Sequence, residues 1–451
     1  MSFIVKNYWK YFKRKYYKSY TTQKQIRNLP LAEIQKIQWN RLKELLQTVY
    51  ESSDFYHECF KSVNLKPQDI KSYTDFAQLP IVNKKILKNN YKRIIAKGSS
   101  DQDYIVSCSA GSTGEPFSFL VDKKREGPAT FAAFMLNKER IGINPFKKMN
   151  ELMIKAEPTN EIKNLYEPNK QRTLHRLIYH FFSETLGIRS SEIKENNIKA
   201  IYSIIKNNNI ERIYGYSSNI FYLAKLFDMH NLEVKMKYVI LISESLLKQQ
   251  KDFISNTFHC PLYMDYGASE CMRMGFECNQ YNGYHIDIYN YYFEYLDETG
   301  KPCKPGENAN IVVTNLNNYI FPLIRYNIGD QCIISNEKCS CDQNYPLVNK
   351  ITGRQSDIIK TSSNDEISLS NFHAILEYLY EYIMQYQIIV DEKAKEIIIK
   401  IAPTQKFKTE TIDEIKKQIL ELINHSMDVK IELVEKIPFE KHGKTKSLII
   451  K

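Results

Sequence analysis

The sequence predicts an α/β protein in which a large multi-layer α/β domain is followed by a small α+β domain. The chain has 451 residues, enough for two or three domains, and 43% of them are apolar, enough for a sizeable core. Between about residues 100 and 350, short β-rich runs alternate with helical runs, the pattern of a layered α/β domain. After Gly353 the order of elements changes to that of an α+β domain.

The first 32 residues predict a basic amphipathic arm. Apolar and aromatic side chains recur there at helical spacing, at Val5, Trp9, Phe12, Tyr16 and Tyr20. Residues 1–32 hold eight of the 63 basic residues and none of the 52 acidic ones, so most of the net charge of +11 comes from the arm. Nucleic acid is therefore not an expected partner of the body. Two interpretations remain open: residues 1–28 contact a membrane surface, or the helix packs on the body through Trp9 and Phe12.

The elements of the body follow from the periodicity of its apolar residues. A helix is predicted around 42–49. The large domain is then predicted to contain strands at 104–110, 237–243, 260–267 and 309–316, and helices at 191–209 and 218–230. The small domain is predicted to contain helices at 370–384 and 411–423, and strands at 386–391, 396–402 and 429–434. The predicted domains are an arm at 1–32, a large domain at 33–353 and a small mobile domain at 354–451.

No apolar run reaches the length of about 18 residues that a membrane helix needs, and the N-terminus lacks the features of a signal peptide. The sequence thus predicts a cytoplasmic protein, with peripheral contact at the inner face of the membrane if the arm binds lipid. The nine cysteines are an odd number in such a chain, which argues against a disulfide framework. The cysteines are then expected to be free thiols or metal ligands. The sequence does not predict an oligomeric state.

Glycine is scarce, at about 3% against a usual share of about 7%, so a glycine beside polar residues indicates a special backbone position. The segment Ser107–Pro116 combines such glycines with hydroxyl groups after a predicted strand. Its backbone N–H groups and hydroxyls could surround a polyphosphate, through Ser109, Gly111, Ser112, Thr113 and Gly114. The alternative is an ordinary surface loop.

Four further segments occur in a fixed order, Tyr266-Gly-Ala-Ser-Glu270, Arg325-Tyr-Asn-Ile-Gly-Asp330, Gly353-Arg-Gln-Ser-Asp357 and Gly443-Lys444. Together with the Ser/Gly loop, they resemble the adenylate-forming superfamily of acyl-CoA synthetases, adenylation domains and luciferases. Within it the chain is most similar to the phenylacetate-CoA ligase family and its CapK-like branch. The resemblance extends from about residue 34 to the C-terminus. It implies an ATP-dependent ligase that forms an acyl-adenylate and pyrophosphate and then transfers the acyl group, by default to CoA.

The resemblance also implies roles for individual residues. The Ser/Gly loop would hold the phosphates of ATP, and Glu270 would bind Mg²⁺, a cation that prefers carboxylate and phosphate oxygens. The adenine would stack on Tyr266. The rest of that motif and the backbone of residues 243–245 would lie alongside it; these residues are Gly267, Ala268 and Ser269, and Ser243, Glu244 and Ser245. Asp330 would accept hydrogen bonds from the ribose hydroxyls, and Arg354 would reach ribose or phosphate.

The catalytic lysine of the family corresponds to Lys444, which would bridge the substrate carboxylate and the α-phosphate. A hinge in the segment matching Gln355 to Asp357 would move the small domain between the two half-reactions. Taken singly, Glu270 and Lys444 would be read as solvated charges.

Four residues suggest a metal site. Cys278 and His285 are separated by six residues, and Cys339 and Cys341 by one. Three thiolates and an imidazole suit tetrahedral zinc, although the spacing is not that of a common zinc finger, and reduced buried thiols are the alternative. Related phenylacetate-CoA ligase-like proteins often carry such residues at these places, so the resemblance implies structural zinc.

The chain also departs from the family pattern. Glu115 stands where many relatives carry lysine, the segment before Lys444 lacks the usual arginine-rich run, and the residues after Asp357 lack the longer glycine-containing loop of CoA ligases. These changes leave the acyl acceptor open. An amine or a sugar hydroxyl, in capsular polysaccharide or natural-product assembly, is the alternative to CoA. A second alternative is a non-enzymatic protein that binds membrane or nucleic acid through the basic arm.

Overall fold

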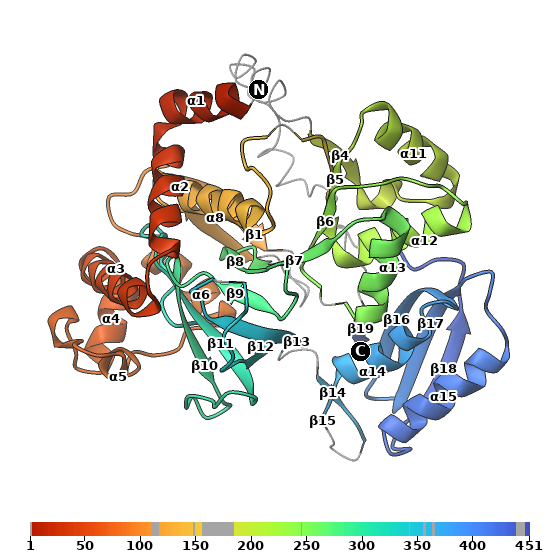
Figure 1. Cartoon of the computed structure of the whole chain (residues 1–451). Coiled ribbons are helices and arrows are strands. Elements are labelled where there is room, and N and C mark those ends of the chain that lie inside the picture. Colours follow the sequence, from red (N-terminus) through yellow and green to blue (C-terminus); the bar gives the residue numbers. More distant parts are fainter. Residues whose placement is uncertain are drawn as a thin grey trace. The chain divides into compact units, whose positions relative to one another are not determined.

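A computed structural model describes residues 2–109, 117–147, 149–155, 185–244, 246–341, 343–354, 358–362, 366–438 and 447–451. The chain forms two compact units, one of residues 1–147 and 265–352 and one of residues 148–264 and 353–451 (Figure 1). The last boundary between the two units lies between residues 352 and 353, one residue before the expected boundary between the large and the small domain. The division into an arm, a large domain and a small mobile domain stays a prediction.

The first unit begins with helices. They are α1 (Ser2–Phe12), α2 (Arg14–Arg27), α3 (Leu31–Ser52), α4 (Asp54–Ser62), α5 (Tyr73–Phe76), α6 (Lys84–Asn89), α7 (Tyr91–Ile94) and, after a hairpin, α8 (Glu126–Arg140). The helix predicted around 42–49 is confirmed, because α3 buries Leu42, Leu45, Leu46 and Val49 on one face.

The strands of the first unit form a hairpin and a sheet. The hairpin pairs β1 (Tyr104–Ser109) antiparallel with β2 (Phe117–Asp122). The sheet has the order β10-β11-β12-β13-β9-β8-β7. Its strands are β7 (Leu262–Ala268), β8 (Met272–Glu277), β9 (Tyr284–Ile286), β10 (Tyr291–Leu296), β11 (Asn308–Asn315), β12 (Tyr326–Ile334) and β13 (Leu347–Arg354).

The arm packs on the first unit. The indole of Trp9 stacks on the ring of Phe131, with 4.3 Å between ring centroids, and α2 lies beside α8 (Figure 1). Glu139 of α8 accepts hydrogen bonds from Tyr20 and from Lys24 and Arg27. The interpretation that the arm packs on the body is confirmed at Trp9; the side chain of Phe12 lies outside the described part of the structure. In the described residues no helix is both long and apolar enough to cross a membrane.

The second unit contains a parallel sheet in the order β6-β5-β3-β4. The strand β6 is apolar and buried on both faces, as expected for a strand of a parallel sheet that helices cover. The elements are β3 (Glu151–Lys155), β4 (Thr185–Arg189), α11 (Ile198–Asn207), β5 (Arg212–Tyr216), α12 (Ser217–Met229), β6 (Tyr238–Ile242) and α13 (Lys248–Phe258). The helix expected over 191–209 is shorter than predicted, because residues 190–192 and 195–197 form 3₁₀ turns before apolar residues recur at helical spacing.

The C-terminal part of this unit is an α+β layer. Its four-stranded sheet has the order β18-β17-β16-β19, and α14 and α15 share its apolar core. The elements are β14 (Ile358–Lys360), β15 (Glu366–Ser368), α14 (Leu369–Tyr378), β16 (Ile383–Asp391), β17 (Glu396–Pro403), α15 (Glu410–Leu422), β18 (Asp428–Leu433) and β19 (Leu448–Ile450). The predicted α/β class is thus confirmed. The helix predicted at 370–384 is too long, because a turn follows Tyr378 and β16 begins at Ile383 to pair with β17.

Within the second unit, the C-terminal layer is fastened to α12. The ammonium of Lys225 on α12 donates a hydrogen bond to the carbonyl oxygen of Ile383, the first residue of β16. Burial lowers the pKa of Lys225 to about 7, an effect that the nearby Glu377 opposes. The aromatic ring of Tyr380 also contacts Phe221 and Phe253. Any movement of the small domain away from α12 must therefore break a buried polar contact and an aromatic cluster.

Candidate functional site

The turn after β7 depends on a glycine. Gly267 pairs with Arg273 across a register shift between β7 and β8. A Cβ atom at Gly267 would lie 1.7 Å from the carbonyl oxygen of Met272, so no larger residue fits without a backbone shift. This close approach confirms the expectation that this glycine is needed for its backbone. It fixes the course of the motif Tyr266–Glu270.

Two of the predicted motifs meet at a buried hydrogen bond. The hydroxyl of Tyr266 donates to Oδ2 of Asp330 over 3.0 Å. Asp330 lies on β12, after Gly329, whose φ of +84° favours glycine. Burial, together with the charge of Asp330, raises the pKa of Tyr266 well above its usual range, so the phenol keeps its proton and remains a donor. The hydrogen bond orients one carboxylate oxygen of Asp330.

Glu270 follows directly after this motif turn. Glu270 is only 7% exposed, so the alternative interpretation, a solvated charge, is wrong. A buried carboxylate needs a positive or hydrogen-bonding partner to stay ionised. The Mg²⁺ that the resemblance implies would be one such partner, and this role stays a prediction.

Arg325, the first residue of the motif that ends at Asp330, has a structural role. Its guanidinium forms a buried ion pair with Glu294 of β10, with 2.8 Å between Nη2 and Oε1. It also donates to the carbonyl oxygens of Ala77 and Leu79. Arg325 thus ties the segment before α6 to the sheet that carries Asp330.

Sequence reasoning missed Lys84. Its ammonium lies 3.0 Å from the hydroxyl oxygen of Ser109, the residue at which β1 leads into the Ser/Gly loop. It also lies 6.0 Å from the ring centroid of Phe117, where the chain returns from that loop. Lys84 therefore places a positive charge at the base of the loop. Nothing local in the sequence distinguishes it from its neighbour Lys85, because its contact with Ser109 joins two segments that are 25 residues apart.

Several predicted residues lie outside the described part of the chain. They are Gly111, Ser112, Thr113 and Gly114 of the loop, Glu115, Ser245, the hinge segment 355–357 and Lys444. Their roles stay predictions.

The second unit holds three of the remaining candidates. Glu244 accepts a hydrogen bond from the backbone N–H of Ser218 over 2.9 Å, and its carbonyl oxygen accepts one from the hydroxyl of Ser217 over 2.7 Å. These contacts fix the backbone next to Ser243, whose φ of 75° lies in the left-handed region. Arg354 ends β13 and is exposed. Tyr266, Gly267, Ala268, Ser269, Glu270 and Asp330 belong to the first unit.

The predicted metal ligands do come together. The ligand atoms of Cys278, His285, Cys339 and Cys341 all lie within 4.8 Å of one another. The sulfurs of Cys278 and Cys339 are 3.5 Å apart, and the sulfur of Cys341 is 3.1 Å from Nε2 of His285. None of the nine cysteines, all of which the structure describes, forms a disulfide.

The protonation of His285 also suits a metal ligand. Its Nδ1 lies 3.2 Å from the carbonyl oxygen of Tyr345, which accepts a hydrogen bond only if Nδ1 carries the proton. The lone pair of Nε2 then faces the thiols, as in metal-bound histidines. Burial and the neighbouring Arg140 lower the pKa of His285 to about 4, so the ring is neutral at physiological pH. Clustered thiolates repel one another, and a divalent cation removes that repulsion. The donor set fits zinc.

Comparison with known proteins first defines the class of fold. The structure is similar to a solved structure of 2-hydroxyisobutyryl-CoA ligase in the postadenylation state, with a TM-score of 0.75 and 19% sequence identity. The similarity covers 94% of this chain and 91% of that one. The fold is that of the adenylate-forming ligases.

Sequence comparison then identifies particular relatives. Residues 359–451 match the family described as the CapK C-terminal domain. The chain is 23% identical to protein CapK of Staphylococcus aureus, over 97% of this chain and 94% of that protein. It is 22% identical to phenylacetate-coenzyme A ligase of Thermus thermophilus, over 87% of this chain and 86% of that protein. The resemblance to the phenylacetate-CoA ligase and CapK-like family is confirmed.

Proposed function

We propose that this protein is an ATP-dependent ligase that activates a carboxylic acid as an acyl-adenylate, releases pyrophosphate and transfers the acyl group to CoA. One observation carries the proposal most directly: the hydrogen bond between Tyr266 and Asp330, which joins two separately predicted nucleotide motifs at a buried carboxylate. The structural relatives support it, since solved structures of 2-hydroxyisobutyryl-CoA ligase contain an acyl-AMP, and two of them contain CoA as well.

In this proposal the chain's own residues bind and orient ATP. Asp330, which the hydrogen bond from Tyr266 orients, accepts hydrogen bonds from the ribose hydroxyls, and Tyr266 lies at the adenine. The Ser/Gly loop and Lys84 surround the phosphates, where negative charge develops during the first step. Glu270 would hold Mg²⁺, which would bridge phosphate oxygens. Lys444 would contact the substrate carboxylate and the α-phosphate, and Arg354 the ribose or a phosphate.

The proposed first step is tested by exchange of labelled pyrophosphate into ATP. A screen of aryl, fatty and amino acids is expected to find at least one acid that makes this exchange depend on added carboxylate. Omission of Mg²⁺ should abolish the exchange. If no acid supports exchange in folded protein, the ligase proposal is wrong, and a non-enzymatic binding function takes its place.

The acceptor requires a separate assay. CoA is the default, supported by the CoA ligases among the relatives. The amine or sugar alternative is supported by the missing glycine-containing loop after Asp357. Once the acid is known, formation of an acyl-CoA thioester separates CoA from an amine or hydroxyl acceptor.

Membrane contact by residues 1–28 remains a secondary proposal, supported by the basic residues of the arm. It must use a face other than the one carrying Trp9 and Tyr20, because these side chains pack against Phe131 and Glu139.

Replacing Lys84 with alanine is expected to slow pyrophosphate exchange by about tenfold to a hundredfold, mainly through weaker ATP binding. The reason is the loss of one charge-assisted contact near the phosphates, which contributes about 1.5–3 kcal/mol. The Lys85→Ala variant is the matched control, because Lys85 is exposed on the same helix. Equal KM values for ATP in both variants would show that Lys84 does not act on the nucleotide.

A further inference from the structure

A second candidate binding site lies in the first unit, away from the predicted nucleotide motifs. It is a pocket of about 400 Å³ between α2, α3, the start of α8 and the loop after β11, a volume within the range of small-molecule sites. Five basic side chains and one acidic side chain line it, Lys15, Lys18, Arg41, Lys124, Arg125 and Glu44. We call it the arm pocket. Its lining is strongly positive.

One wall of the arm pocket is a face of α2. Lys15, Lys18, Ser19 and Thr22 are spaced by three, one and three residues, so they project from the same side of the helix. Both lysines are exposed, and within the described residues neither makes an ion pair. The contact of the Tyr16 ring with Phe131 and the ion pairs of Lys24 and Arg27 with Glu139 hold α2 against α8. The two ammonium groups therefore belong to a fixed helix and not to a loose tail.

The facing wall holds its arginines rigidly. The guanidinium of Arg41 donates to the carbonyl oxygen of Leu316 and to Oδ1 of Asn317, over 3.2 and 2.7 Å. It also lies over the ring of Tyr289, 4.1 Å from the centroid. The guanidinium donates a third hydrogen bond to the carbonyl oxygen of Tyr289, so two of its five N–H groups remain available. Arg125 similarly stacks on Tyr319, 4.0 Å from that ring's centroid.

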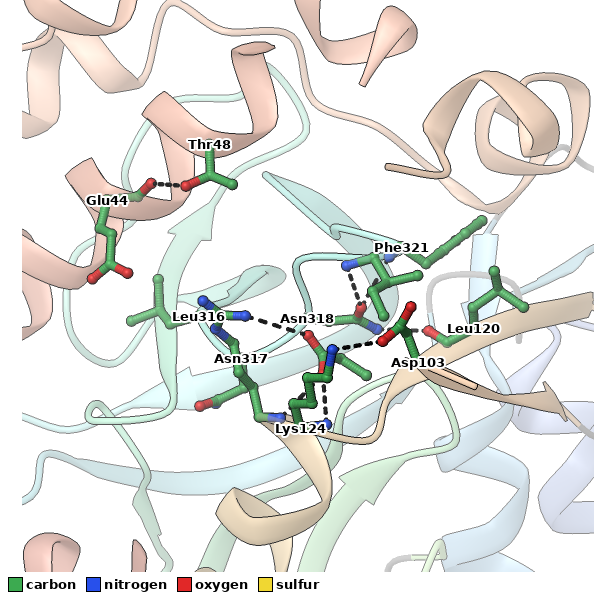
Figure 2. A network of polar contacts seen from close by, with 12 residues as sticks. Glu44, Thr48, Asp103, Leu120, Lys124, Leu316, Asn317, Asn318 and Phe321 are labelled. Carbon is green, nitrogen blue, oxygen red and sulfur yellow. Dashed lines mark hydrogen bonds and ion pairs between the residues drawn. The ribbon is translucent and has the colours of Figure 1, made fainter. Parts of the chain in front are cut away.

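The acidic groups around the arm pocket are each engaged. Lys124 pairs with Asp103 over 2.6 Å, and Figure 2 shows this pair beside Leu316 and Asn317, with Glu44 on the neighbouring helix. Asp122 is buried and accepts the backbone N–H groups of Lys124 and Arg125. Burial and the charge of Glu44 raise the pKa of Tyr319 to about 12. Against the five basic side chains, Glu44, Asp103 and Asp122 leave a net charge of +2, and within the described residues neither Lys15 nor Lys18 forms an ion pair with these acids.

The remaining lining residues supply neutral donors and an apolar floor. Gln23 and Asn317 are buried, and Gln23 is fixed by hydrogen bonds with Ser19 and Asn290. Pro128, Ala129 and Leu316 add apolar surface. Such a lining suits an anionic group attached to a larger body, since preformed donors surround the charge and apolar atoms contact the remainder.

From this arrangement we infer that the arm pocket binds a phosphate group, through Lys15, Lys18 and Arg41. The phosphate can belong to a soluble phosphorylated compound or to the headgroup of an anionic lipid. The inference does not depend on the ligase activity, because none of its residues belongs to the proposed ATP site. It assigns a binding role to two of the basic residues of the arm, Lys15 and Lys18.

The test compares the full-length protein with the Lys15→Ala/Lys18→Ala double variant. The control is Lys10→Ala/Arg14→Ala, which removes the same charge from exposed positions of the arm that do not line the pocket. Binding of inorganic phosphate is measured by calorimetry, and binding to phosphatidylglycerol vesicles by sedimentation, with phosphatidylcholine vesicles as the neutral reference. The pocket variant is expected to bind at least about tenfold more weakly than the control variant.

The two probes separate the sources of the phosphate. A loss confined to inorganic phosphate supports a soluble ligand, and a loss confined to anionic vesicles supports a lipid headgroup. The inference is overturned if the native protein binds neither probe, or if the pocket and control variants lose the same affinity. Pyrophosphate exchange by the pocket variant should equal that of the native protein. The phosphate-binding assays therefore test the arm pocket, and the exchange assay separately tests the ligase proposal.

Discussion

The Asp330→Ala variant is expected to lose at least about a hundredfold in carboxylate-dependent pyrophosphate exchange. The carboxylate would accept hydrogen bonds from both ribose hydroxyls, and hydrogen bonds to a charged group contribute about 1.5–3 kcal/mol each. Losing two such bonds lowers the rate by roughly two to four orders of magnitude. The measurement is exchange at saturating acid and a range of ATP concentrations.

A graded control separates the ribose contact from a folding defect. In the Tyr266→Phe variant the carboxylate stays, and only the 3.0 Å hydrogen bond that orients it is removed. This variant is expected to lose about tenfold or less. Thermal melting of both variants checks that they remain folded. If Asp330→Ala keeps exchange within a few-fold of the native rate, Asp330 does not hold the nucleotide and the proposed site is wrong.

The sequence predicted those parts of this site that depend on local pattern. Scarce glycines pointed to Gly267, where the carbonyl of Met272 leaves no room for a side chain. The order of the motifs pointed to Tyr266 and Asp330, which the structure joins. The spacing of apolar residues predicted the alternation of helices and strands, because burial of one helix face or strand requires that period.

The parts that the sequence could not predict depend on contacts between distant segments. In the sequence, Arg325 belongs to a nucleotide motif. In the structure it forms an ion pair with Glu294 on β10, which is two strands from β12 in the sheet. Lys84 contacts Ser109, which lies 25 residues further along the chain. The end of α14 was misplaced for the same reason. Residues after Tyr378 keep a helical pattern, but pairing with β17 makes Ile383–Asp391 a strand.

The burial of Glu270 could also not be predicted from the sequence. In sequence, a glutamate after a tight turn is expected to be solvated. Here the sheet around β7 and β8 leaves it 7% exposed, close in the chain to the buried Cys271. A buried glutamate departs from the usual exposure of its residue type, so the local sequence could not predict it.

Removal of the proposed zinc is expected to destabilise the protein and to reduce its exchange activity. Metal analysis of purified protein should find about one zinc per chain. Cys278 directly follows β8, and Cys339 and Cys341 follow β12, so one ion would join the end of the strand after Glu270 to the loop after Asp330. Without the ion, a buried thiol, a buried imidazole and two half-buried thiols share a cluster with no metal ion to hold them together.

The Cys339→Ser/Cys341→Ser double variant tests this expectation. It should contain no zinc and melt roughly 10 °C below the native protein, since a loss of several kcal/mol shifts the Tm by about 2–4 °C per kcal/mol in domains of 150–250 residues. Cys59→Ser is the control, because Cys59 lies on α4 and outside the cluster. A native preparation that is free of metal yet stable and active would contradict the zinc proposal, because the four side chains would then be a reduced thiol cluster. Loss of stability with unchanged exchange would instead show that the ion holds the loop without shaping the nucleotide site.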